Sequence, residues 1–279
     1  MFSDKIIIIT GASSGIGKEI SLNLSKENAQ LIFISRNLSS LKILSNGIHN
    51  NKNLLYSLNV SKTKEVQKFY QFVKSKYSRI DCIINCAGIF GPIGKLEQVS
   101  PDNFLIPIQT NLIGTYNMCY YGLPFLKKSE HAKIINFSGG GTTSSFPNYS
   151  GYACSKIALV KLTENMAIEY PNLDINIIAP GFIKTPLAKQ TIKSKEKAGT
   201  FYTKTIEMLN NGGVSVKYVV SLCKFLISNK SDGISGKFIS APWDNWEKQS
   251  FIDKLKTDKD YCTLRRIDNK FFQALKKIK

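Results

Sequence analysis

The stretch "TGASSGIG", residues 10–17, completes the β-branched run "KIIIIT" (5–10) and opens a segment with helical apolar periodicity. The run predicts a buried strand of a parallel sheet, so the glycines lie in a strand–turn–helix connection. Gly11 suits the tight turn, while Gly15 and Gly17 let backbone approach a pyrophosphate and the sheet. The start of the helix presents free N–H groups and its positive dipole end to phosphates. This context predicts a dinucleotide-binding turn.

The other residues of the turn support that prediction. Ser13 and Ser14 can add hydroxyl contacts to phosphate, and Ile16 belongs to the same candidate cofactor-binding set. A nucleoside-triphosphatase phosphate loop needs Gly, four residues, then Gly-Lys-Ser/Thr. Ala12 and Glu19 occupy its outer positions, so the spacing excludes that motif. A turn with a purely structural role is the alternative.

Short apolar runs alternate with helix-like segments along most of the chain. This pattern predicts an α/β fold with a doubly wound, mostly parallel sheet of about seven strands, a Rossmann-type domain. The helical segment at 101–128 is expected to be interrupted near Pro107 and Pro124. The expected strands are 5–10, 29–35, 54–60, 80–85, 133–138, 175–180 and 236–240, and the other expected helices are 15–27, 38–50, 63–77, 150–170 and 215–228.

One domain accounts for the core-forming segments. Residues 1–241 are expected to form the dinucleotide-binding and catalytic domain, and 242–279 a C-terminal extension that packs on it or on a neighbouring subunit. Residues 185–213 are polar and rich in lysine. Because they follow a strand end, we expect them to form a mobile substrate lid.

The composition of the 279 residues limits the classes of protein. The chain is 43% hydrophobic, which suffices for a large core, yet it has no apolar run of about 18 residues, so no membrane span is expected. The first residues lack the pattern of a signal peptide, which predicts a cytoplasmic protein. Six cysteines without a CxxC pair and two histidines predict reduced thiols and no metal site.

The formal net charge of +18 raises the possibility of a nucleic-acid partner. The lysines are spread along the whole chain, however, with modest clusters at 193–197 and 276–279. No tract of five or six basic residues occurs. We therefore expect a solvated basic surface and no nucleic-acid partner. The same charge would attract anionic small molecules.

The segment "GYACSK", residues 151–156, places a tyrosine and a lysine four apart in a predicted helix. Tyr152 and Lys156 therefore project from the same helix face. A free tyrosine has a pKa of about 10, and a nearby ammonium favours its phenolate and lowers that pKa. An exposed tyrosine and lysine on an ordinary helix are the alternative.

Five motifs together resemble the short-chain dehydrogenase/reductase family over roughly residues 4–241. They occur in the order and at the spacings of the family's shorter, single-domain branch, and the joint match is far more specific than any one motif. The motifs are Gly11-x3-Gly15-x-Gly17, "NCAG" (85–88), Asn111 in "TNLIGTYN", Tyr152-x3-Lys156 and "PGFIKT" (180–185).

The resemblance implies catalytic roles. Tyr152 would be the general acid/base, Lys156 would tune it and bind the nicotinamide ribose, and Asn111 would anchor a proton relay through a water. The substrate-positioning serine of the family lies 13 residues before the tyrosine, where this chain has a glycine. One extra loop residue would leave Ser138 in that role. The alternatives in the same loop are Thr142, Thr143 and Ser144.

The residues at the end of the second predicted strand indicate which dinucleotide is preferred. Ser35 and Arg36 stand where an acidic residue would select NAD, and Arg36 can offer a bidentate fork to a 2′-phosphate. NADP(H) is therefore preferred, with NAD(H) possible; a solvated Arg36 is the alternative. The resemblance implies that the remaining cofactor contacts are Asn59 and Val60, then Asn85, Ala87 and Gly88, and finally Pro180, Gly181, Ile183 and Thr185.

These observations predict an oxidoreductase that interconverts a secondary alcohol and a ketone with NADP(H). The ending "GKFISAPWDNWE" (236–247) departs from the family's usual close and resembles a subgroup associated with polysaccharide and sugar modification, which implies a sugar-like or polyhydroxylated substrate. Steroid, fatty-acyl and small diketone substrates are the alternatives. A catalytically silent dinucleotide-binding redox sensor is the alternative. Oligomers are common in the family, so we expect a homodimer or homotetramer formed through the helices at 101–128 and 150–170.

Overall fold

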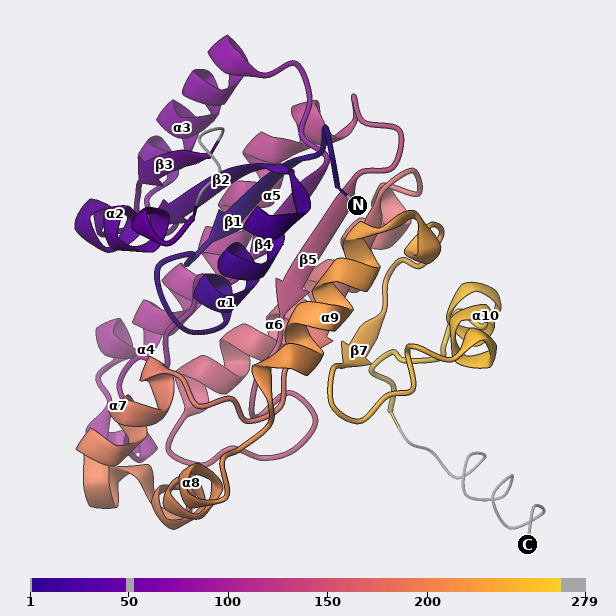
Figure 1. The fold of residues 1–279 in the computed structure, drawn as a ribbon. Helices are drawn as coiled ribbons and strands as arrows, with labels where there is room; N and C mark the ends of the chain where they lie inside the picture. The colour runs from indigo at the N-terminus through magenta and orange to yellow at the C-terminus, as the bar shows by residue number, and fades with distance from the viewer. Residues whose placement is uncertain (1, 49–52, 267–279) are drawn as a thin grey trace, which may run out of the picture.

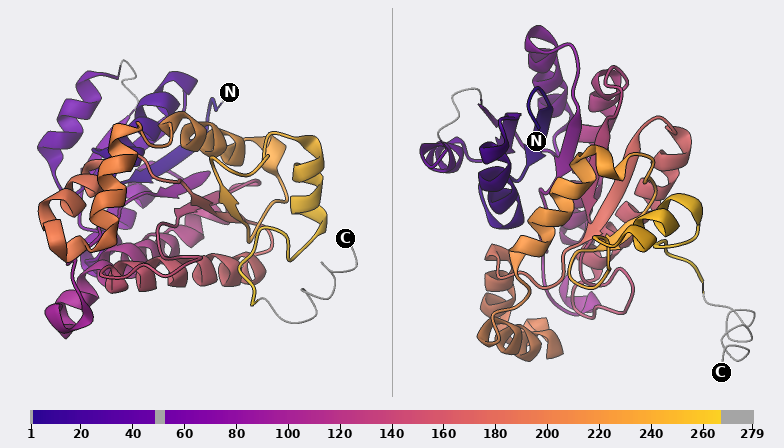
Figure 2. Two further views of the ribbon diagram at one scale, coloured as in Figure 1. Left: turned by 90° about the horizontal axis from the view of Figure 1, so that it is seen from below. Right: turned by 45° about the vertical axis from the view of Figure 1, so that its right-hand side comes forward.

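The computed structural model describes residues 2–48 and 53–266 as three layers, a parallel sheet between two layers of helices (Figure 1; Figure 2). The strand order is β3-β2-β1-β4-β5-β6-β7, and every neighbouring pair is parallel. The predicted doubly wound sheet is therefore confirmed. The strands are β1 (Ile6–Thr10), β2 (Gln30–Ser35), β3 (Leu54–Ser57), β4 (Cys82–Asn85), β5 (Lys133–Phe137), β6 (Asp174–Ala179) and β7 (Phe238–Ser240).

The helices connect these strands in the expected alternation. Short 3₁₀ turns lie at Ser25–Glu27, Leu96–Gln98, Lys195–Ala198 and Asn229–Ser231. The α-helices are α1 (Gly15–Leu24), α2 (Leu38–Asn46), α3 (Thr63–Lys76), α4 (Pro101–Pro107), α5 (Gly114–Leu126), α6 (Ser150–Glu169), α7 (Pro186–Ser194), α8 (Thr200–Asn210), α9 (Val216–Ile227) and α10 (Gln249–Thr257).

Both faces of the sheet are buried, which explains why its strands are apolar along their whole length. Ile7 and Ile9 of β1 pack in the core beneath α1, α2 and α9, whereas Ile8 packs in the core beneath α3, α5 and α6. Successive side chains of a strand point to opposite faces, so one unbroken isoleucine run serves two cores.

The strand order reverses between β1 and β4, where β1 has β2 on one side and β4 on the other. Ile9 is in register with Phe33 on one side and with Ile84 on the other. The connections leaving the two strands diverge to opposite sides and leave a crevice beyond the carboxyl ends of the strands. The glycine turn and the "NCAG" segment both begin at this edge.

Several strands and helices are shorter than expected, and the largest difference in a strand is at β3. Strand β3 ends at Ser57 rather than at residue 60, because Asn59 turns the chain: its N–H donates to Glu65 and its side chain accepts the N–H of Ser61 at 3.1 Å. The interruption expected near Pro107 is confirmed, since a π-helical segment, Ile108–Ile113, follows that proline. The interruption expected near Pro124 is wrong, because Pro124 lies within the last turn of α5 without interrupting it.

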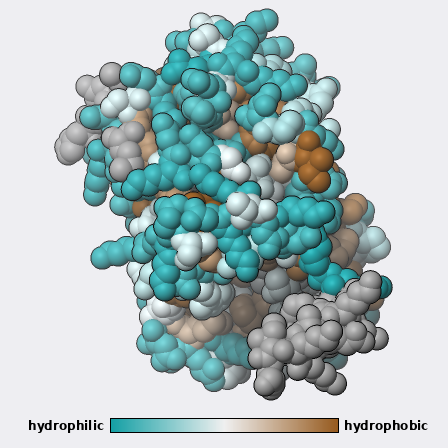
Figure 3. All heavy atoms as spheres, turned by 90° about the vertical axis from the view of Figure 1, so that its right-hand side faces the viewer, coloured by the Kyte–Doolittle hydropathy of each residue, from teal (hydrophilic) through white to brown (hydrophobic). Residues whose placement is uncertain are grey.

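The residues after 241 pack on the same core. Trp246, Ile252 and Leu255 join the cluster beneath α9. The Nζ of Lys237 donates to the carbonyls of Asp258, Lys259 and Tyr261 at 2.6–3.2 Å, which fastens the chain beyond α10 to β7. The face of the molecule in Figure 3 is mainly hydrophilic. Residues 267–279, the last part of the expected C-terminal extension, lie outside the described residues, and the boundary at 241 stays a prediction.

Within residues 2–48 and 53–266, no helix is both long enough and apolar enough to cross a membrane.

Candidate functional site

A groove of about 320 Å³ runs along the carboxyl edge of the sheet and continues into a second cavity of about 350 Å³. The two share Ile16, Cys86, Gly88, Thr185 and Leu187 in their walls. Most of the predicted cofactor-binding residues line the groove: Gly11, Ser13, Ser14, Gly15, Ile16, Gly17, Arg36, Asn59, Val60, Ala87, Gly88 and Thr185. Pro180, Gly181 and Ile183 line the second cavity.

The glycine turn has the close approaches that its sequence predicts. Gly11 has a φ of +65°, and a Cβ there would lie 2.9 Å from the main-chain nitrogen of Ala87. A Cβ on Gly17 would lie 2.4 Å from the carbonyl oxygen of Gly11. Only glycine fits either position, because the obstructing atoms are main-chain atoms. The turn thus opens the start of α1 to the groove, where N–H groups can bind phosphate oxygens.

Arg36 lies exposed at the end of β2, where the groove begins. No ion pair occupies its guanidinium within the described residues. Ser35 beside it is buried, and its hydroxyl donates to the Asn37 carbonyl at 2.9 Å. The groove therefore presents a free cation and no carboxylate at this end of β2.

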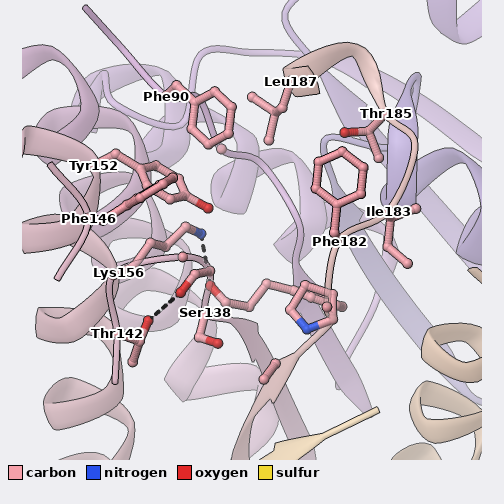
Figure 4. Close-up of a pocket in the computed structure, with 18 of the residues that line it drawn as sticks. Phe90, Ser138, Thr142, Phe146, Tyr152, Lys156, Phe182, Ile183, Thr185 and Leu187 are labelled. Carbon is pink, nitrogen blue, oxygen red and sulfur yellow. Dashed lines mark hydrogen bonds between the residues drawn. The ribbon is translucent and has the colours of Figure 1, made fainter. Parts of the chain in front are cut away.

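Tyr152 and Lys156, both in α6, are each 6% exposed and line the second cavity (Figure 4). The Nζ of Lys156 lies 5.8 Å from the centre of the Tyr152 ring and donates to the Phe137 carbonyl at 2.8 Å. Helix α6 therefore brings the phenol and the ammonium to the end of β5. The alternative of an exposed tyrosine and lysine is excluded by their burial.

Burial controls the pKa values of this pair. Desolvation lowers the pKa of Lys156 to about 8, and it raises the pKa of the Tyr152 phenol above its ordinary value. The direction for Tyr152 is opposite to the one expected from the ammonium alone. A buried phenol is harder to ionise, and here that cost outweighs the attraction of a lysine whose own charge is disfavoured. The protonated phenol is the stable form at neutral pH.

The residue beside the phenol is Gly139, 13 residues before Tyr152. A Cβ on Gly139 would lie 1.9 Å from the Tyr152 hydroxyl oxygen, so the phenol occupies space that any side chain at 139 would fill. Ser138, the predicted substrate-positioning residue, is buried, and its hydroxyl donates to the Ile178 carbonyl at 3.2 Å. Thr142 donates to the Gly139 carbonyl at 2.7 Å. Both hydroxyls line the cavity, but each one is hydrogen-bonded to a main-chain carbonyl.

Asn111 is fully buried in the π-helical segment. Its amide accepts the N–H of Ile89 at 2.9 Å and donates to the Ile89 carbonyl at 3.0 Å and to the Ser155 hydroxyl at 2.9 Å. Single π-helical turns often occur at functional sites, and this one aims the amide at α6. A Cβ on Gly88 would lie 3.4 Å from the Asn111 Oδ1 and 3.6 Å from the Lys156 Nζ, so both face one space.

Asn85 is the predicted cofactor-binding residue that lines neither cavity. Its side chain is buried and donates to the Oδ1 of Asn136 at 2.9 Å, and Asn136 donates to Thr163 in α6 at 2.9 Å. This chain of amides ties β4 to β5 and to α6. Asn85 therefore holds the elements of the site together without lining either cavity.

Sequence reasoning did not identify the aromatic residues of the second cavity. They come from separate strands, loops and a helix. Five follow a strand end or lie in the predicted lid, and two lie within strands β5 and β7, so no single sequence signal joins them. They are Phe90, Phe137, Phe146, Phe182, Phe201, Phe238 and Trp243. The lid segment itself contains two helices, α7 and α8, whereas the sequence indicated only a polar stretch.

No group of three or more His, Cys, Asp or Glu side chains among the described residues is arranged to hold a metal ion.

Comparisons with known proteins identify the family. The family model for the short chain dehydrogenases matches residues 5–196. A 3-oxoacyl-[acyl-carrier-protein] reductase of Thermotoga maritima is 31% identical over 240 residues, which cover 84% of this chain and 95% of that protein.

Solved structures have the same fold. The crystal structure of levodione reductase superposes with a TM-score of 0.79 at 23% identity, covering 88% of this chain and 98% of that one. The ligand-free aldohexose dehydrogenase of Thermoplasma acidophilum has a TM-score of 0.74 at 26% identity and covers 85% and 92%. The family match, the glycine turn and the Tyr152–Lys156 pair lead to one conclusion: the chain belongs to the short-chain dehydrogenase/reductase family of NAD(P)-dependent oxidoreductases.

Proposed function

We propose that this protein interconverts a secondary alcohol and a ketone with NADP(H), using Tyr152 as general acid/base. The observation that carries the proposal is the burial of Tyr152 and Lys156 together where the dinucleotide groove meets the second cavity. In the reducing direction, a ketone, NADPH and one proton give a secondary alcohol and NADP⁺. The dinucleotide supplies the hydride from the nicotinamide C4.

The side chains of the site carry out the proton transfer, stabilise the phenolate and support its reprotonation. The Tyr152 hydroxyl donates its proton to the carbonyl oxygen, and the Lys156 ammonium stabilises the phenolate that forms. The buried amide of Asn111 holds Ile89 and Ser155 in place, and we propose that it also anchors the path by which the phenol is reprotonated. Ser138 stays a prediction for the substrate contact, because its hydroxyl would first have to leave the Ile178 carbonyl.

The preference for NADP(H) rests on Arg36 at the mouth of the groove and on Ser35 in place of an acid. Arg36→Met should lower kcat/KM for NADPH about 30-fold and leave that for NADH unchanged, because one charge-assisted contact to phosphate is lost. Lys42→Met, an exposed cation on α2 outside the groove, is the matched control. Initial rates with both dinucleotides measure the ratio. Equal losses for NADPH and NADH would contradict the assignment.

The pKa directions predict how the rates depend on pH. Ketone reduction needs the protonated phenol, which burial stabilises, and a charged Lys156, whose pKa is lowered to about 8. Its kcat should therefore be flat below pH 8 and fall above it. Alcohol oxidation needs the phenolate beside a charged Lys156, so its kcat should rise with pH up to about 8 and level off above it. Steady-state rates from pH 6 to 10 in both directions test this, and a fall in reduction between pH 6 and 7 would contradict it.

The alternative function, a catalytically silent redox sensor, shares the groove but predicts NADPH binding without consumption. Ketone-dependent loss of NADPH absorbance, absent in Tyr152→Phe, separates the two. The polyhydroxylated substrate expected from residues 236–247 stays a prediction. By their names, the relatives in fold include both a sugar dehydrogenase and levodione reductase, so likeness of fold favours neither substrate.

We also propose a homodimer or homotetramer formed through α4 to α6. Large apolar side chains on these helices are between 43% and 81% exposed: Leu105, Ile106, Tyr116, Tyr120 and Ile168. A second copy would bury them, which favours association. Light scattering of the purified protein gives the mass directly.

A further inference from the structure

The second cavity has seven aromatic side chains in its walls besides Tyr152, and we name it the aromatic chamber. It measures about 350 Å³, and its nicotinamide end is marked by Ile16, Ile183 and Thr185. The rest of the space lies between the seven aromatic residues defined above and the glycine loop of residues 139–141. This volume is at the small end for a ligand site, so a compact substrate fits it.

The chamber has little capacity to bind polar groups. Among the described residues that line it there is no Asp, Glu, Asn, Gln, Arg or His, and Lys156 is the one cation. Three of its hydroxyls already have partners. Ser138 and Thr142 donate to main-chain carbonyls, and Thr191 accepts from the Tyr149 hydroxyl at 2.9 Å. Of the other lining hydroxyls, those of Thr143 and Ser144 belong to exposed residues, and Thr185 lies at the nicotinamide end. A polyol or a carboxylate buried beside the phenol would therefore lose more hydrogen bonds to water than the chamber replaces.

One wall of the chamber consists of aromatic rings packed around the phenol. Phe90 packs edge-on against Tyr152 with ring centres 4.7 Å apart at 81°, and Phe146 lies 6.2 Å from the same ring. Phe146 stacks on the fully buried Tyr149 at 4.3 Å, and Phe201 of the lid packs on Phe146 at 4.6 Å. These contacts place apolar ring surface beside Tyr152.

The facing wall contains Phe182, and the turn that carries Trp243 lies beside it, because a Cβ on Gly181 would lie 3.1 Å from the Pro242 side chain. In Figure 4, Phe182 lies across the chamber from Tyr152. Trp243 is 72% exposed, yet the turn that carries it is fixed: Asp244 accepts the N–H of Ser240 at 2.7 Å, and the buried indole of Trp246 donates to the Ala241 carbonyl at 3.0 Å. An exposed indole held over an apolar cavity gains burial when a ligand covers it.

We propose that the chamber binds an uncharged ketone built on one or two apolar rings. The rings lie between the Phe90–Phe146 wall and the wall of Phe182 and Trp243, and the carbonyl oxygen meets the Tyr152 hydroxyl. This inference rests on the proposed function, because it assigns the substrate class of the same site. It follows from the absence of acidic, amide, arginine and histidine side chains among the described lining residues and from the opposed aromatic surfaces.

The test measures ketone binding to protein saturated with NADP⁺, so that affinity is read without turnover. Isothermal titration with 2-decalone, cyclohexanone, 4-oxocyclohexanecarboxylate and D-fructose covers a bicyclic, a monocyclic, a charged and a polyhydroxylated ketone. We expect 2-decalone to bind about 50-fold more tightly than cyclohexanone, because it buries four more carbons. The charged and polyhydroxylated ketones should bind more weakly than cyclohexanone. Either of them binding as tightly as 2-decalone would overturn the proposal.

A variant tests the facing wall. Trp243→Ala should reduce the preference for 2-decalone over cyclohexanone about 10-fold, and Trp243→Phe should restore most of it, because a ring is regained. Tyr218→Ala, which removes a 53% exposed aromatic on α9 outside the chamber, is the matched control. A preference unchanged in Trp243→Ala would overturn the role of this wall.

The same experiments distinguish failure of the proposed function from failure of the proposed substrate class. If NADP⁺ does not bind, or if bound 2-decalone is not reduced with NADPH, then the proposed oxidoreductase is wrong. If dinucleotide binding and ketone reduction are present but the affinities do not favour apolar rings, then only the substrate class is wrong.

Discussion

Gly139→Ala should lower kcat/KM for ketone reduction about 100-fold while leaving the free energy of unfolding nearly unchanged. The added Cβ would lie 1.9 Å from the Tyr152 hydroxyl oxygen, so the phenol must move by more than an ångström to reach ordinary contact. A displacement of that size between reacting groups costs about 100-fold in rate. The obstructing atoms are the hydroxyl and two ring atoms of the Tyr152 side chain and include no main-chain atom, so the fold can accommodate the alanine.

A double-mutant cycle shows whether the alanine acts through the phenol. Tyr152→Phe alone should lower kcat about 1,000-fold, since the proton donor is lost. Adding Gly139→Ala to Tyr152→Phe should cost little more activity, because the displaced hydroxyl is no longer there. Steady-state rates and urea unfolding of the four proteins provide the data. Additive losses, or a large loss of stability in Gly139→Ala alone, would show that the glycine serves the fold and not the phenol.

Lys133→Met should destabilise the protein by about 3 kcal/mol. Lys133 begins β5, is 1% exposed, and pairs with Asp174 at the start of β6 and with Asp232. The Nδ1 of His131 lies 3.6 Å from the Oδ2 of the same Asp232. Removing the ammonium leaves two partly buried carboxylates without their partner, which costs more than the pair itself contributes. Urea denaturation measures the change.

The matched control is Lys161→Met, whose ammonium is 58% exposed and pairs with Glu164. Exposed pairs contribute little, so this variant should lose less than about 1 kcal/mol. Asp174→Asn and Asp232→Asn added to Lys133→Met should recover part of the stability. Because the cluster lies at the opposite end of the strands from Tyr152, folded Lys133→Met should retain its kcat. Equal losses in the two lysine variants would contradict a buried cluster.

The sequence indicated the sheet, the glycine turn and the Tyr152–Lys156 pair because each depends on residues close together in the chain. The unbroken apolar run of β1 predicts a strand buried on both faces, and Gly11 and Gly17 predict main-chain contacts that the structure shows. A spacing of four in a helix puts two side chains on one face wherever that helix lies. Local geometry alone was sufficient for these features.

The tertiary structure decided what surrounds the phenol. The rings of the aromatic chamber come from positions between 90 and 243, and no local pattern joins them. The pKa of Tyr152 rises because those distant elements exclude water from it. The same packing gave Asn85 a partner in Asn136 and gave Ser138 a partner in Ile178. Burial and hydrogen-bond partners depend on which elements meet in space, so a sequence without a fold determines neither.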